Sequence, residues 1–255
     1  MSLTLTELGA SPAAANPGGA CAGHLVRGGG AALVLDCGFG AAGRLRAQLP
    51  LADLGAIVIS HLHPDHYADL VPLRYALTYA EPRAERVPLY LPPGGIERMR
   101  GVGRALPGDA EFFAACFAMR EYAPGETLEI ADVQVTLLAV QHYIPSHAMR
   151  VRAGGRVLVY SADVAPCRAL EEAAGDADLF LCEASLLGVD EDEPDPARRG
   201  HLTAEEAGRV ARAAGVGRLL LTHCPLDRRD ARRAAAETGF GAGVDFAVEG
   251  ESYSV

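Results

Sequence analysis

The stretch "ISHLHPDHYADL" (residues 59–70) places three histidines and two aspartates in a short span that begins at the end of an apolar run. Because residues i and i+2 of an extended chain point the same way, the side chains of His61 and His63 can converge on one point. The proline after His63 keeps that residue extended and suits the start of a helix, from which Asp65 and His66 reach a neighbouring point. Imidazoles and carboxylates in this arrangement indicate a pair of metal ions.

Three more metal-competent residues follow strongly apolar runs elsewhere in the chain. His142 comes after "VTLLAV", Asp163 after "RVLVY" and His223 after "RLLLT". Any one of them alone is more typical of a hydrogen-bonded core or turn residue. Together with the opening motif, they favour a shared site at the ends of several strands.

The order His-x-His-x-Asp-His, His, Asp, His resembles the metallo-β-lactamase superfamily. This resemblance implies an α/β fold, the four-layer αββα sandwich, in a single domain spanning residues 1–255, with the metals at one edge of the paired sheets. It implies two divalent metal ions, one held by His61, His63 and His142, the other by Asp65, His66 and His223, with Asp163 bridging them. Zinc suits these ligands, and Mn²⁺ or Fe²⁺ is compatible with them. Asp36, at the end of "ALVLD", is expected to support the site from behind the ligands or to cap its strand.

Two C-terminal segments, "LFLCEASL" and "RGHLTAEEAGRVARAAGVGRLLLTHCP", resemble ribonuclease Z and its phosphodiesterase relatives, including the atypical cyclic-nucleotide phosphodiesterases. The resemblance implies that Glu183 and His201 form a proton-donating pair, and that Asp65 orients an attacking hydroxide generated at the metals. The flanks of the pair differ, because ribonuclease Z typically has His-Glu-Ala-Thr and His-Ser-Thr at these places. The alternative role for His201 is a helix-entry residue just before Thr203.

Ribonuclease Z usually carries a long glycine- and lysine-rich arm between its third histidine and bridging aspartate. Here that interval is 21 positions (163 − 142), which is enough for a hairpin only. The chain has no lysine and a net charge of −10, so phosphate contacts with extended nucleic acid have no obvious source. We therefore expect a phosphodiesterase for small substrates such as cyclic nucleotides. The alternatives are a tRNA 3′-processing endoribonuclease without the arm and a thioester or lactone hydrolase of the same superfamily.

Composition sets further limits. The chain has 255 residues, of which 49% are hydrophobic, which is enough for one large core. No apolar run reaches the roughly 18 residues that a membrane span needs, and the first residues lack a signal-peptide pattern, so we expect a cytoplasmic protein with no membrane partner. The six cysteines form no C-x-x-C pair and are expected to be reduced core thiols, with packing favoured over a place near the metals for Cys224. A homodimer is left open.

Strands alternate with helices along the chain. The predicted strands are Leu3–Leu8, His24–Arg27, Ala31–Asp36, Ala56–Ile59, Val87–Leu91, Val133–Val140, Ala148–Arg152, Arg156–Tyr160, Leu179–Cys182, Arg218–Leu221 and Val244–Val248. The predicted helices are Ala41–Gln48, Tyr67–Tyr79, Gly94–Gly103, Ala110–Met119, Pro166–Ala174, Thr203–Ala214 and Arg228–Thr238, with a capping box at Thr203. Segments 72–120 and 188–200 are expected to govern substrate specificity. Arg150 is interpreted as a surface ion-pair residue, with a phosphate contact as the alternative.

Overall fold

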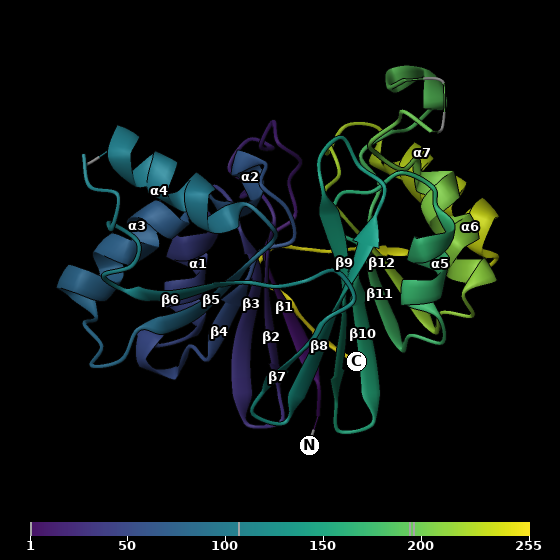
Figure 1. Cartoon of the computed structure of the whole chain (residues 1–255). Helices are drawn as coiled ribbons and strands as arrows, with labels where there is room; N and C mark the ends of the chain where they lie inside the picture. Colours follow the sequence, from purple (N-terminus) through teal and green to yellow (C-terminus); the bar gives the residue numbers. More distant parts are fainter. Residues whose placement is uncertain (1, 107, 194, 196) are drawn as a thin grey trace.

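The computed structural model describes residues 2–106, 108–193, 195 and 197–255. Two seven-stranded sheets face each other, and helices cover the outer face of each (Figure 1). This arrangement confirms the predicted four-layer αββα sandwich.

The first sheet has the strand order β14-β1-β2-β3-β4-β5-β6, antiparallel from β14 to β3 and parallel from β3 to β6. Its strands are β1 Thr4–Gly9, β2 Gly23–Gly28, β3 Ala31–Cys37, β4 Ala56–Val58, β5 Val87–Leu91, β6 Phe117–Glu121 and β14 Ser252–Ser254. The helical segments of this half are α1 Ala41–Gln48, η1 Leu51–Asp53, α2 Pro64–Tyr67, α3 Leu70–Tyr75, η2 Ala76–Ala80 and α4 Gly95–Ala105.

The second sheet has the order β13-β12-β11-β10-β9-β8-β7, with β10 to β13 parallel and the rest antiparallel. Its strands are β7 Thr127–Ile130, β8 Val133–Val140, β9 Ser146–Ala153, β10 Arg156–Tyr160, β11 Leu179–Glu183, β12 Arg218–Thr222 and β13 Asp245–Phe246. The helical segments are α5 Arg168–Ala174, η3 Val189–Glu191, α6 Ala204–Ala213 and α7 Arg229–Phe240.

The central strands are buried on both faces, which explains their continuous apolar sequences. In β3, Leu33 and Leu35 face the core between the sheets, whereas Val34 packs toward the helices of the first half. In β12, Leu220 faces the same central core, and Leu221 packs toward the helices of the second half. Alternate side chains of one strand therefore pack on opposite sides of its sheet, one set against the other sheet and the next against the helices.

Parallel strands bring their carboxyl ends to one edge of the sandwich, the edge at which α2 lies in Figure 1. Asp36 lies near the end of β3 and His61 follows β4. Asp163 follows β10, Glu183 ends β11 and His223 follows β12. These five polar residues, which are far apart in the sequence, therefore lie at the same edge of the sandwich.

Two predicted helices differ from the structure. The prediction of a helix over Ala110–Met119 is wrong, because residues 110–116 form turns and β6 begins at Phe117. The apolar side chains of Phe112, Phe113 and Phe117 pack into the core from these turns and from the start of β6. The single helix predicted over Tyr67–Tyr79 is divided into α2, α3 and a π-helical turn, η2. Strands β6, β7 and β14 were not predicted.

Two expectations from composition, on membrane-spanning helices and on the cysteines, can be compared with the described residues. Among them, no helix is long and apolar enough to cross a membrane. All six cysteines are free, and four of them are buried. The thiol of Cys224 donates a hydrogen bond to the carbonyl of Thr222, 3.0 Å away, which supports a packing role.

The predicted capping box at the start of α6 is confirmed. The hydroxyl of Thr203 accepts from the backbone N–H of Glu206 at 3.2 Å, and the Glu206 carboxylate accepts from the N–H of Thr203 at 2.9 Å. We expect Thr203→Ala to lower the free energy of unfolding by about 1 kcal/mol, because one buried helix-end donor loses its acceptor. Urea denaturation measures this change. Thr238→Ala, on the exposed side of α7, is the control, and an equal loss in both variants would contradict the capping role.

Candidate metal centre and active site

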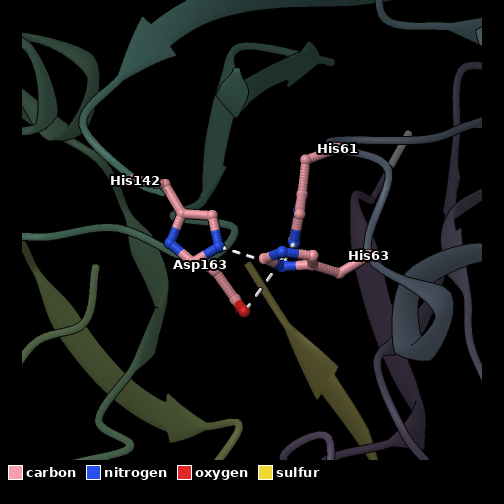
Figure 2. A group of neighbouring side chains, drawn as sticks. All are labelled: His61, His63, His142 and Asp163. Carbon is pink, nitrogen blue, oxygen red and sulfur yellow. Dashed lines mark hydrogen bonds and ion pairs between the residues drawn. The ribbon is translucent and has the colours of Figure 1, made fainter. Parts of the chain in front are cut away.

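The first group of candidate ligands joins His61, His63, His142 and Asp163, whose donor atoms all lie within 4.8 Å of one another. Figure 2 shows the four side chains pointing toward a common point. His63 Nδ1 lies 3.2 Å from His61 Nε2 and 3.1 Å from His142 Nε2. Oδ2 of Asp163 lies 3.8 Å from His61 Nε2. The set contains three imidazoles and one carboxylate.

The second group joins Asp65, His66, Asp163 and His223, again within 4.8 Å. Nε2 of His66 lies 3.4 Å from Asp65 Oδ2 and 3.4 Å from Asp163 Oδ1. Nε2 of His223 lies 3.3 Å from Asp65 Oδ2 and 3.5 Å from Asp163 Oδ1. Asp163 therefore turns one carboxylate oxygen toward each group. All seven predicted ligands come together in the expected division.

Local structure near α2 explains how adjacent residues reach both groups. His63 is the extended residue before the helix, with φ −79° and ψ 142°, and the proline that follows it occupies the first helical turn. His61 and His63 thus precede the helix and join the first group, whereas Asp65 and His66 lie in the helix and join the second.

Backbone strain also concentrates here. Asp36, Ala162 and His223 have φ values of 57°, 52° and 52°, in the left-handed region that residues other than glycine rarely adopt. Asp36 lies near the end of β3, Ala162 directly precedes Asp163, and His223 is itself a candidate ligand. Such strain persists where packing over-determines the backbone, and it is common at functional sites.

In most of the candidate ligand rings, Nδ1 points away from the point where the donor atoms converge and has a fixed hydrogen-bond partner. This leaves the inner nitrogen, Nε2, available as a ligand. The pairs are His66 Nδ1 with Asp36 Oδ2 at 2.8 Å, His61 Nδ1 with Ser60 Oγ at 3.0 Å, His142 Nδ1 donating to the Gly200 carbonyl at 2.7 Å, and His223 Nδ1 with Ser185 Oγ at 2.9 Å. These contacts orient the rings before any ion binds.

The residues fit a metal. Among the described residues, His66 Nε2 and Asp163 Oδ1 are buried without a hydrogen-bond partner, which is costly unless a further group satisfies them. Burial lowers the pKa of His61, His63 and His142, so these rings are neutral and their inner nitrogens carry lone pairs. Converging lone pairs and a carboxylate are suited to a divalent cation.

Asp36 supports the site, as expected, rather than only capping β3. Its carboxylate accepts from the Ser60 N–H and hydroxyl, both at 2.7 Å, from the Tyr160 hydroxyl at 2.9 Å, and contacts His66 Nδ1. We expect Asp36→Asn to weaken metal binding about 10- to 100-fold, because the amide holds the His66 ring less well. Competition with a chromogenic chelator measures the affinity. Asp178→Asn is the matched control, because this half-buried aspartate also accepts a backbone N–H, from Val157, but is not among the contacts of the candidate ligands. Metal affinity that is unchanged in Asp36→Asn would contradict the supporting role of Asp36.

Glu183 and His201 form a close pair beside the ligands. Nδ1 of His201 donates to Glu183 Oε1 at 2.9 Å, and the His201 ring lies 5.1 Å from that of His142 and 5.9 Å from that of His223. Burial alone would lower the pKa of His201, but the Glu183 carboxylate outweighs it and raises the pKa to about 9. The imidazole is therefore cationic near neutral pH and carries a proton that it can donate.

The spacing of Glu183, His201 and His223 could also accommodate an ion. However, the Glu183 carboxylate already accepts hydrogen bonds from the Val164 N–H, from the Ser185 N–H and hydroxyl, and from His201. A carboxylate satisfied in this way is better suited to holding the His201 ring than to binding a metal. His201 also lies just before Thr203, the N-cap of α6. Its place at the entry to that helix is therefore compatible with a role as proton donor.

The surface ion pair expected for Arg150 is not found among the described residues. Its guanidinium donates to the carbonyls of Ala173 and Gly175, at 2.7 and 2.8 Å, and so satisfies the C-terminus of α5. A phosphate contact by Arg150 stays a prediction.

Several contributing residues were not predicted. Ser185 contacts His223, and Gly200 accepts from His142, although the partners are 38 and 58 positions apart. Gly200 is the last residue of the acidic segment 188–200, and its N–H donates to Asp192 of the same segment, so its contact with His142 places the end of that segment against the site. Contact of segments 72–120 and 188–200 with substrate stays a prediction.

Known proteins resemble this chain over nearly its whole length. Residues 32–224 match the family described as "Beta-lactamase superfamily domain". The probable metallo-hydrolase YhfI of Bacillus subtilis is 30% identical over 235 residues, with 91% of each chain covered. The crystal structure of YhfI matches with a TM-score of 0.85 over 99% of both chains.

Two other similarities point to the ribonuclease Z-like branch and to the shared fold. Ribonuclease Z of Mycobacterium marinum is 28% identical over 265 residues, with 95% of each chain covered. A diphosphatase of the PhnP family, 18% identical, shares the fold with a TM-score of 0.73 over 98% of this chain and 97% of its own.

Proposed function

Because the chain belongs to the metallo-β-lactamase superfamily, in its ribonuclease Z-like branch, we propose that this metal-dependent hydrolase cleaves phosphodiester bonds of small substrates such as cyclic nucleotides. The observation that carries the proposal is the Glu183–His201 pair, 2.9 Å apart, beside the two ligand groups. A protonated imidazole at this place can supply the proton that an alkoxide leaving group needs.

We assign the seven candidate ligands to two ions, with zinc as the leading choice and manganese or iron as compatible alternatives. When bound, such ions lower the pKa of water and neutralise negative charge that grows on phosphoryl oxygens. The shared Asp163 supports two sites rather than one, because its oxygens face different ligand groups.

The chain's own residues then have distinct tasks. Asp65, whose Oδ2 lies between His66 and His223, orients the attacking water and accepts its proton. His201 donates its proton to the departing oxygen on the opposite side of phosphorus. Glu183 holds the His201 ring and keeps it charged, because a nearby carboxylate favours the imidazolium.

The segment between His142 and Asp163 favours small substrates over tRNA. It consists of β9 and β10 joined by a turn at Gly154 and Gly155, with no inserted arm. The 33 acidic residues outnumber the 23 basic residues, all of them arginine, and the resulting net charge of −10 disfavours broad contact with an extended phosphate backbone. The ribonuclease Z relative nevertheless makes tRNA 3′ processing the second candidate function.

A panel of substrates tests the proposal. Metal-loaded protein is assayed against bis(p-nitrophenyl) phosphate, cyclic AMP, precursor tRNA, a thioester and a lactone. We expect hydrolysis of the first two, with little cleavage of precursor tRNA. Preference for precursor tRNA would establish the second candidate, and activity confined to the thioester or lactone would refute phosphodiester chemistry.

A further inference from the structure

Tyr143 is a large aromatic residue at the site to which the proposed reaction assigns no task. It directly follows His142, yet 51% of its surface is exposed. Its ring centroid lies 4.9 Å from that of His142 and 5.7 Å from that of His201. An exposed ring thus stands beside both a candidate ligand and the proposed proton donor.

The ring is held in place from two sides. The Tyr143 hydroxyl donates to Asp192 Oδ1 at 2.5 Å, and Asp192 Oδ2 accepts from the Gly200 N–H at 3.1 Å. The Gly200 carbonyl in turn accepts from His142, which closes a loop of contacts back to the neighbour of Tyr143. A Cβ on Gly200 would lie 2.2 Å from the tyrosine ring, so the absence of a side chain there lets the ring pack against the backbone.

This fixed orientation matters for binding. An aromatic side chain that is already immobilised loses little conformational entropy when a ligand stacks on it. The hydrogen bond from the Tyr143 hydroxyl to Asp192 and the close packing against Gly200 supply this immobilisation.

The position of the ring indicates which part of a substrate it would meet. The departing oxygen must approach His201 to receive its proton, and the group attached to that oxygen must then extend past His201. Resting on the proposed function, we propose that Tyr143 is a specificity-determining residue that stacks on the planar base of a nucleoside carrying the leaving oxygen.

The charge of the neighbouring wall favours a neutral base over a further phosphate. Segment 188–200, which supplies the Tyr143 tether, contains five acidic residues and two arginines, and two of its carboxylates, Glu191 and Glu193, are paired with Arg228 and Arg198. The segment therefore keeps a net negative charge, which disfavours a continuing phosphate chain beyond the leaving oxygen. A single nucleoside, as in a cyclic nucleotide, avoids that repulsion.

The test compares 3′,5′-cyclic AMP with the 3′,5′-cyclic phosphate of ribose that lacks a base. For Tyr143→Ala, we expect kcat/KM on cyclic AMP to fall roughly tenfold or more, mainly through KM, with little change on the abasic compound. Tyr143→Phe keeps the stacking face but loses the hydrogen bond to Asp192, so it should keep most, but not all, of the wild-type kcat/KM on cyclic AMP. Tyr143→Leu keeps apolar bulk without an aromatic face and should resemble alanine. Tyr79→Ala removes another exposed tyrosine, in η2, and is the control for the loss of an exposed aromatic side chain that is not at the site.

The outcomes separate this inference from the proposed function. Equal losses on both substrates, or a leucine variant that matches phenylalanine, would overturn the stacking role while leaving phosphodiester hydrolysis intact. Hydrolysis of bis(p-nitrophenyl) phosphate without any hydrolysis of the cyclic compounds would overturn the stacking role and the choice of cyclic nucleotides as substrates, while leaving phosphodiester hydrolysis intact. A metal-loaded wild-type protein that hydrolyses no phosphodiester would overturn both.

Discussion

Replacing Asp163 with alanine is expected to remove metal from both ligand groups and to lower phosphodiester hydrolysis by about 10³-fold or more. The reason is geometric, because Oδ1 of Asp163 faces His66 and His223, whereas Oδ2 faces His61. Loss of one side chain therefore removes a donor from each group. Elemental analysis of dialysed protein measures the metal content, and the same samples give the rate.

Asp230→Asn is the matched control, since it changes an exposed aspartate in the first turn of α7. It should keep the metal content and the rate of the wild type. An Asp163→Ala protein that folds normally and retains both ions would show that Asp163 does not bridge them.

The second large effect is expected for His201→Ala, and it should depend on the leaving group. The variant should retain its metals, because His201 is not among the seven assigned ligands. On a substrate with an alkoxide leaving group, the rate should fall about 10²- to 10⁴-fold, which is the usual contribution of general acid catalysis. On bis(p-nitrophenyl) phosphate the loss should be much smaller, because p-nitrophenolate departs without a proton.

The two substrates act as controls for each other. Equal slowing of both would mean that His201 positions the substrate or maintains the structure and does not donate a proton. Glu183→Gln should reproduce part of the leaving-group dependence, because it leaves the His201 ring without the carboxylate that keeps it protonated.

Some of the site could be predicted from the sequence because the information is local. The i, i+2 spacing of His61 and His63 and the proline that follows place these rings without knowledge of the fold. The residues at the ends of β8, β10 and β12 were found because apolar strands end abruptly in a polar residue there. The carboxyl ends of parallel strands then meet at one edge.

The contacts behind the ligands could not be predicted in the same way. Ser185 reaches His223 and Gly200 reaches His142 across loops whose paths depend on the packing of the second half. Arg150 was misinterpreted because nothing near it in the sequence indicates that the end of α5 lies within reach. The helix predicted before β6 is absent because residues 110–116 form turns whose phenylalanines are buried, and hydrophobic periodicity alone does not distinguish a short apolar segment of helix from other buried structure.

The most direct test of the two-metal phosphodiesterase is a titration of metal-depleted protein with Zn²⁺ during hydrolysis of bis(p-nitrophenyl) phosphate and cyclic AMP. The proposed site predicts no hydrolysis without metal, and rates that rise until about two equivalents per chain are bound. A stable, metal-free protein that hydrolyses both substrates at the full rate would contradict it.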